Sequence, residues 1–175
     1  MLGLMNVASP WLAPHWAAHI QQQLNSYQRW LGSDLIDRSG TAEEQARRVF
    51  EAPFVVVSHG TQADPILNSA NAIALELWEL PLEKFLQTPS RLTAEPLHRD
   101  ERSRMLETTS RQGYIDDYQG IRISSTGRRF HIARATVWNI VDEHGQPAGQ
   151  AATFSHWEFL DDQSRHDAAQ SARPS

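Results

Sequence analysis

Histidine side chains are the first candidates for chemistry in this chain, because an imidazole can bind a metal ion or exchange a proton near neutral pH. His15 and His19 lie four residues apart in a segment with helical periodicity, a spacing that zinc sites use. No glutamate follows His15, no third ligand can be named, and the 175 residues include no cysteine. We therefore expect no metal site.

Two serine–histidine neighbours have the residue types of a nucleophile and its base: Ser58 with His59, and Ser155 with His156. Adjacent residues of a strand point to opposite faces of a sheet, so we expect neither pair to form the hydrogen bond that this chemistry requires. The two pairs of adjacent aspartates are Asp116 with Asp117 and Asp161 with Asp162, and we expect the side chains within each pair to point apart for the same reason. The sequence therefore predicts no catalytic residue and favours a binding protein over an enzyme.

The charge balance argues against several classes of partner. The formal net charge is −5, from 16 Lys and Arg against 21 Asp and Glu, whereas general nucleic-acid binders are usually basic. Residues 99–104 are rich in arginine, but acids at helical spacing favour ion pairs within one solvated helix. Apolar runs are far shorter than the roughly 18 residues of a membrane span. Without a basic leader at the start, the chain is expected to be cytoplasmic, with no nucleic acid or membrane partner.

The elements that must position these side chains begin with two helices. Apolar residues recur every three or four positions over residues 14–31, which predicts an amphipathic helix that ends at Gly32. A capping box that starts at Thr41 predicts a second helix, and Pro53 ends it.

The remainder predicts a sheet with a helical connection. Short strands at residues 54–58 and 65–68 precede several small helices, the first of which Asn68 or Ser69 is expected to cap. Two tight turns then separate three antiparallel strands, over residues 118–125, 129–141 and 149–160. This order predicts an α+β domain with a five-stranded antiparallel sheet, preceded by two N-terminal helices.

Longer motifs in this order resemble those of PAS domains, and of one narrower family. The segments that carry the resemblance are Pro-Phe-Val-Val-Val-Ser-His-Gly-Thr at 53–61, Pro-Ser-Arg-Leu-Thr-Ala-Glu-Pro at 89–96, Gly-Ile-Arg-Ile-Ser-Ser at 120–125 and Gln-Ala-Ala-Thr-Phe-Ser-His-Trp at 150–157. They resemble bacterial MEKHLA-domain proteins and the C-terminal region of plant class III homeodomain–leucine zipper regulators. Neither predicted hairpin has the aspartate that PAS domains place directly before the turn glycine.

The resemblance implies a PAS-like MEKHLA domain over residues 52–160, after an arm and amphipathic helices at 1–51 and before a disordered tail at 161–175. It also implies a cavity between sheet and helices. With no cysteine, a covalently attached chromophore is excluded, and residues 111–115 lack the histidine that a haem sensor would need. A non-covalent flavin or another small molecule stays open as a ligand.

Polar side chains on the strands are the candidates for binding such a ligand, because a few polar groups in an apolar pocket give recognition. Strict alternation along residues 129–141 places Phe130, Ile132, Arg134, Thr136, Trp138 and Ile140 on one face, and leaves open which face is the inner one. The candidates are Asn68, Trp78, Arg122, Thr136, Trp138, Thr153 and His156. The alternative is a filled core in which these groups bond to the backbone.

We expect a stand-alone sensory or interaction module that binds a small ligand or a protein partner and signals through the helix at residues 14–31. The apolar stripe of that helix predicts a homodimer or a partner protein. Two alternatives stay open: a small enzyme that uses the cavity, and a purely structural dimerisation domain whose cavity is filled by tryptophan.

Overall fold

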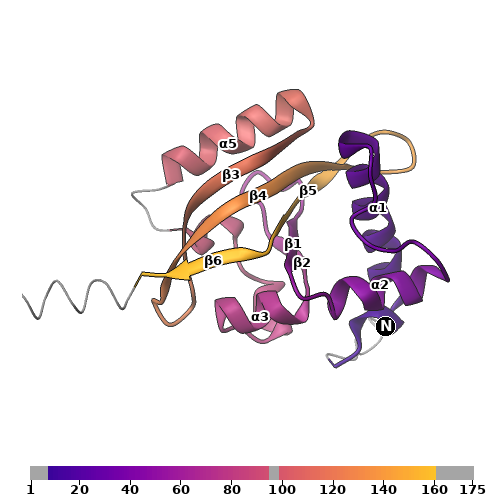
Figure 1. Cartoon of the computed structure of the whole chain (residues 1–175), viewed down its shortest axis with the longest axis horizontal. Helices are drawn as coiled ribbons and strands as arrows, with labels where there is room; N and C mark the ends of the chain where they lie inside the picture. Colours follow the sequence, from indigo (N-terminus) through magenta and orange to yellow (C-terminus); the bar gives the residue numbers. More distant parts are fainter. Residues whose placement is uncertain (1–7, 95–98, 161–175) are drawn as a thin grey trace, which may run out of the picture.

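The computed structural model describes residues 8–94 and 99–160 (Figure 1). The predicted disordered tail, residues 161–175, lies outside the described residues. The two predicted N-terminal helices are present as α1 (Pro14–Leu31) and α2 (Ala42–Phe50), after a short 3-10 helix η1 (Pro10–Leu12). In this part of the chain no helix is both long and apolar enough to cross a membrane.

Both helix ends that the sequence indicated have the expected chemistry. Gly32 closes α1 with a φ of 75°, a left-handed conformation that glycine adopts without steric strain. At the start of α2 the Thr41 hydroxyl accepts from the Glu44 amide at 3.1 Å, and the Glu44 carboxylate accepts from the Thr41 amide at 3.2 Å. This capping box satisfies two backbone donors that the helix would otherwise leave open.

The strands form one antiparallel sheet in the order β2-β1-β5-β4-β3, with β6 paired to β4 beyond the end of β5. The strands are β1 (Val55–His59), β2 (Leu67–Ala70), β3 (Tyr114–Ile123), β4 (Arg129–Val141), β5 (Pro147–Phe154) and β6 (His156–Phe159). The helices α3 (Ala72–Trp78), α4 (Leu82–Phe85), η2 (Ser90–Thr93) and α5 (Arg99–Gln112) connect β2 to β3. The predicted α+β class with an antiparallel sheet is confirmed, although the last predicted strand is divided, so that the described residues form six strands instead of five.

The division between β5 and β6 reverses the alternation of side chains across the sheet. Ser155 separates the two strands, and in the neighbouring strand Arg134 adopts a φ of 53°. Phe154 and Trp157 are three residues apart yet lie on one face, with ring centroids 5.9 Å apart. A regular strand would place residues at this spacing on opposite faces.

The same reversal divides β4. Phe130 and Ile132 pack in the core beside α3 and α4, whereas Trp138 and Ile140 pack beside Tyr27 of α1. The prediction that these four β4 residues share one face is therefore wrong. The physical reason is the left-handed residue Arg134, which breaks the two-residue period at its own position.

Helices cover both faces of the sheet (Figure 1). The face covered by α3, α4 and α5 is here called the cavity face, and it carries Val57, Ile132, Val137, Ala152 and Phe154. The opposite face, packed against α1 and α2, is called the α1 face, and it carries Val56, Ser58, Trp138, Ile140 and Ala151. In Figure 1, α1 stands across one end of the sheet, away from α5 and α3.

The apolar stripe of α1 is buried within this chain. Trp16, Ile20 and Leu24 are at most 4% exposed and pack with Val49 of α2 and Val56 of β1. Burial of large apolar side chains is the main stabilising contribution to such packing. A second copy of the chain could pair through this stripe only if α1 left its own sheet.

Asn71 holds the start of α3, where Asn68 or Ser69 was expected as the cap. Its side-chain oxygen accepts from the amides of Ala74 and Val56, at 3.3 and 3.1 Å. Its amide nitrogen donates to the carbonyls of Val49 and Phe54, at 3.1 and 2.6 Å. The prediction was wrong because β2 continues through residues 68 and 69, so the helix begins later.

Candidate functional site

A cavity of about 70 Å³ lies between the cavity face and the helices that cover it. That volume holds roughly five to seven non-hydrogen atoms, if each takes the space that one water needs. It is well below the roughly 300–1,000 Å³ typical of sites for larger ligands. Apolar side chains from both layers form most of the wall, among them Leu67, Phe85, Met105, Ile132, Val137 and Phe154.

Two side chains that line this cavity carry buried polar atoms with no hydrogen-bond partner among the described residues. They are the indole nitrogen Nε1 of Trp78 and the amide oxygen Oε1 of Gln150. Trp78 is 4% and Gln150 7% exposed. A buried polar group without a partner destabilises a protein by about 1–3 kcal/mol. One atom is a donor and the other an acceptor, so the residues of the wall include both kinds of hydrogen-bonding group without a partner.

The orientation of the Gln150 amide follows from a chain of bonds across the sheet and α5. Asn139 Nδ2 donates to the carbonyl of Thr109 at 2.9 Å, which fixes Asn139 Oδ1 as an acceptor. Gln150 Nε2 donates to that oxygen at 2.9 Å. Because the nitrogen is engaged in this way, the oxygen of Gln150 is the atom left without a donor.

Arg122 on β3 also lines the cavity, and it is 7% exposed. Its Nη2 donates to the Tyr118 hydroxyl at 2.9 Å, its Nη1 donates to the carbonyl of Ile121 at 3.0 Å, and its guanidinium lies 5.3 Å from the centre of the Tyr118 ring. In the described part of the chain no carboxylate forms an ion pair with it. The cavity wall therefore contains a buried positive charge.

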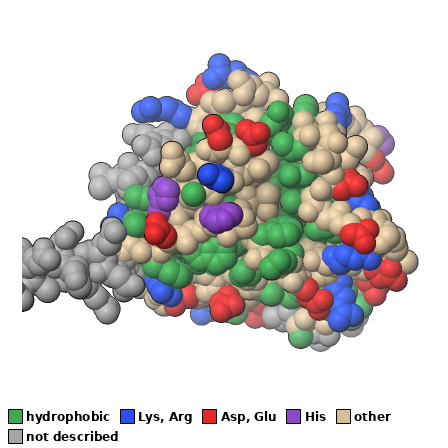
Figure 2. All heavy atoms as spheres, in the orientation of Figure 1, with side chains coloured by type: hydrophobic (Ala, Val, Ile, Leu, Met, Phe, Trp, Pro, Cys, Tyr) green, Lys and Arg blue, Asp and Glu red, His purple; other side chains and the backbone are tan. Residues whose placement is uncertain are grey.

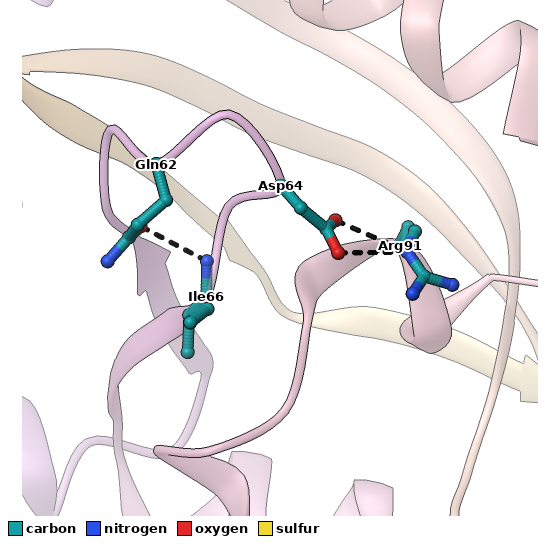
Figure 3. Close-up of polar contacts among 4 residues, drawn as sticks. All are labelled: Gln62, Asp64, Ile66 and Arg91. Carbon is teal, nitrogen blue, oxygen red and sulfur yellow. Dashed lines mark hydrogen bonds and ion pairs between the residues drawn. The ribbon is translucent and has the colours of Figure 1, made fainter.

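A larger hollow of about 470 Å³ adjoins the cavity and shares His59, Leu106 and Gln150 with it. The loop between β1 and β2 forms one side of this hollow, and Figure 3 shows how the loop is held. The Gln62 side-chain oxygen accepts from the amide of Ile66 at 3.2 Å. The Asp64 carboxylate accepts from Nε of Arg91 in η2 at 3.2 Å and forms an ion pair with it.

The floor of this hollow depends on a close approach of two strands. Gly149 has a φ of 132°, and a Cβ there would lie 2.1 Å from the carbonyl oxygen of His59. Only glycine lets β5 pass this close to the end of β1. The His59 ring is held by its Nδ1, which lies 2.9 Å from the carbonyl oxygen of Gly60.

The structure divides the predicted ligand-binding residues between the two faces. Trp78 and Arg122 line the cavity, and their binding of a ligand stays a prediction. The others are on the α1 face or the surface: Asn68, Thr136, Trp138, Thr153 and His156. Strict alternation misplaced the β4 residues because it does not register the reversal at Arg134.

The residues on the α1 face are engaged in structural bonds. Trp138 Nε1 donates to the carbonyl of Gln23 in α1 at 3.1 Å, and Thr153 Oγ1 donates to the carbonyl of Val55 at 2.8 Å. Asn68 Oδ1 accepts from the Ser58 hydroxyl at 2.5 Å. These side chains fasten the sheet to α1 and to itself.

The two serine–histidine pairs behave differently. Ser155 Oγ and His156 Nδ1 are 3.0 Å apart, so the prediction that this pair forms no hydrogen bond is wrong. Ser155 lies at the strand break, where alternation does not hold. Both residues are exposed beside a shallow hollow lined by His131 and Trp157, on the face where Figure 2 shows histidine near hydrophobic side chains. Ser58 and His59 do not bond to one another in the structure.

Ser58 instead meets His19 of α1, whose Nε2 lies 3.0 Å from its hydroxyl. Burial lowers the pKa of His19 below its ordinary value of 6.5, although a hydrogen bond with Asn68 acts in the opposite direction. The neutral imidazole is therefore a structural hydrogen-bonding group. Within the described residues no cluster of three or more histidines and acids could hold a metal ion.

Sequence reasoning missed Gln150 as a cavity residue. Its place as a single polar residue before the apolar run Ala-Ala is a signal that could have identified it. The sequence could not identify the hydrogen-bond partner of Gln150, because only the pairing of β4 with β5 brings Asn139 opposite Gln150.

The chain is 29% identical over 100 residues to the homeobox-leucine zipper protein ATHB-9 of Arabidopsis thaliana, a match that spans 57% of this chain and only 12% of that protein.

Two solved structures share the fold. One is a PAS domain of a protein from Colwellia psychrerythraea, with a TM-score of 0.56, 16% identity and coverage of 63% of this chain and 92% of that one. The other is an RNA-binding light-oxygen-voltage receptor, with a TM-score of 0.56, 14% identity and coverage of 77% and 37%. Residues 17–159 match the MEKHLA domain, so this chain belongs to the MEKHLA domain family and has a PAS-like fold.

Proposed function

We propose that this domain is a sensory module that binds a small ligand in the cavity and passes the signal to α1. The observation that carries the proposal is the pair of buried polar atoms without partners among the described residues, Trp78 Nε1 and Gln150 Oε1, in residues that line a largely apolar cavity. Buried polar atoms in native proteins are almost always hydrogen-bonded. A ligand with complementary groups would satisfy both.

The strands that would carry a signal have the cavity on one side and α1 on the other. In β4, Val137 lines the cavity while the next residue, Trp138, donates its indole hydrogen bond to Gln23 of α1. In β1, Val57 lines the cavity and Ser58 accepts from Gln23. A ligand that displaces these strands would therefore alter the packing of α1 against the sheet.

The two alternatives have less support. An acid–base enzyme needs two ionisable groups within reach of one another, and the described side chains around the cavity offer only His59 and Arg122. A dimerisation domain built on the α1 stripe would need that stripe to be free, whereas it is packed against α2 and β1. The proposal is compatible with a cytoplasmic protein that forms a homodimer, or binds a partner protein, through the exposed side of α1.

The proposal is tested on the full chain by native mass spectrometry of the protein as purified, followed by a metabolite screen that records thermal stability. We expect a ligand of low mass, and slower hydrogen exchange in α1 when it is bound. A protein that retains no molecule, responds to none of the screen and shows no change in α1 would contradict it.

A further inference from the structure

Resting on the proposed function, we propose that the ligand of the cavity is a small aliphatic carboxylate whose anionic group binds Arg122. The proposal starts from an imbalance of charge inside the protein. Arg122 is 7% exposed, and an arginine side chain remains protonated under all ordinary conditions. Charged groups are buried in proteins when they are paired or bind a charged ligand.

Among the residues that the structure describes, the bonds that Arg122 makes leave its charge without a counter-ion. A guanidinium has five N–H donors, and the structure uses one from Nη1 and one from Nη2. Neither acceptor, the Ile121 carbonyl or the Tyr118 hydroxyl, is an anion. One N–H on each of the three nitrogens is left for a ligand.

Two described acids directly follow cavity residues in the sequence: Glu79 after Trp78, and the exposed Glu107 after Leu106. The Glu79 carboxylate accepts from the hydroxyls of Ser124 and Thr126 at the surface. Those hydrogen bonds lower the pKa of Glu79, so the carboxylate is ionised there. It does not neutralise Arg122.

The position of Arg122 relative to Trp78 favours an anion with two oxygens. Arg122 is opposite Phe130 in the sheet register, and the Phe130 ring packs on the Trp78 indole with centroids 5.3 Å apart. Arg122 and Trp78 both line the same cavity. A carboxylate accepts two N–H bonds from a guanidinium in a fork, and its remaining lone pairs suit the unpartnered indole donor.

The other residues of the cavity wall determine the chemistry expected for the remainder of the ligand. Leu67, Phe85, Ile132 and Val137 present apolar surface, which suits an aliphatic chain. Room for roughly five to seven non-hydrogen atoms, two of them carboxylate oxygens, corresponds to about three to five carbons. Butyrate is the natural probe, and butyramide is its uncharged counterpart of equal size.

The experiment measures binding of butyrate and of butyramide to the full chain by calorimetry at pH 7, together with the NMR signal of the Arg122 Nε–H group. We expect butyrate to bind roughly tenfold or more tightly than butyramide, because a hydrogen bond to a charged group contributes that much. Butyrate should shift the Arg122 signal. Arg122→Gln should abolish the preference, whereas the exposed Arg111→Gln should keep it.

Other results separate this inference from the proposed function. If butyramide binds as tightly as butyrate, or if butyrate leaves the Arg122 signal unmoved, the inference of a carboxylate ligand at Arg122 is wrong. The proposal that the cavity binds a ligand then remains. If neither probe binds and the metabolite screen finds an uncharged ligand, the same conclusion holds. If no molecule of any class binds, both proposals fail. The NMR measurement uses the unaltered protein, so the test stands even where Arg122→Gln does not fold.

Discussion

Two buried glutamines, one against each face of the sheet, show how differently the two faces use polar side chains. Gln23 of α1 donates to the hydroxyls of Ser58 and Ser69 at 2.9 and 2.6 Å. Gln150 on the cavity face bonds to Asn139 through its nitrogen and leaves its oxygen without a partner. The polar groups of Gln23 are therefore satisfied within the protein, whereas one polar atom of Gln150 has no partner among the described residues.

Two of the buried tryptophans, Trp138 and Trp78, show the same contrast. Trp138 on the α1 face donates its indole N–H to the carbonyl of Gln23, while the N–H of Trp78 beside the cavity has no acceptor among the described residues. Polar groups on the α1 face should thus contribute to folding stability. Those on the cavity face should contribute to binding, and the following variants test that difference.

The largest effect is expected at Asn71, beneath α2 and α3, where one side chain makes four hydrogen bonds to the backbone. Asn71→Ala should lower the free energy of unfolding by about 4 kcal/mol, because four bonds are lost in a buried site. Asn68→Ala, which removes the bonds to Ser58 and His19, should lower it by about 1–2 kcal/mol. Urea unfolding of both variants checks this, and equal losses would refute the role assigned to Asn71.

The same substitution in each glutamine compares the faces directly. Gln23→Met should destabilise the domain by about 2 kcal/mol, since Ser58 and Ser69 both lose a donor. Gln150→Met should cost about 1 kcal/mol or less, because one bond to Asn139 is lost and an unsatisfied oxygen is removed with it. Denaturant midpoints measure both, and a greater loss for Gln150→Met would reverse the comparison.

A smaller difference is expected between the two tryptophans. Trp138→Phe and Trp78→Phe remove similar volume, but only the first breaks a hydrogen bond. Trp138→Phe should therefore be the more destabilising by about 1 kcal/mol. Thermal unfolding in ligand-free buffer gives the difference, and identical melting temperatures would show that the Trp138 bond contributes nothing.

The smallest effect concerns pH and the α1 face alone. Burial holds the pKa of His19 below 6.5, so the unfolded chain binds a proton more readily than the folded one. Stability from this group is complete above pH 6.5 and decreases as the pH falls through the lowered pKa. His19→Gln keeps a hydrogen-bonding side chain without titrating, so its unfolding free energy should vary less between pH 7.5 and 5 than that of the natural protein. Parallel curves for the two proteins would exclude His19 as the cause.

Sequence reasoning predicted the elements well and the faces poorly. Helical periodicity and the capping box at Thr41 located α1 and α2 because these signals are local. The side of the sheet to which Trp138 points depends on one left-handed residue, Arg134, which is neither glycine nor asparagine and gives no signal in the sequence. The state of Gln150 depends on Asn139 and Thr109, which only the folded sheet and α5 bring together.

The most direct test of the central contrast is a butyrate titration that follows the indole N–H signals of the full chain by NMR. The Trp78 signal should move furthest, because its N–H gains an acceptor, and the Trp138 signal should move less, through the contact between β4 and α1. A Trp78 signal that stays in place while butyrate saturates the protein would contradict the account.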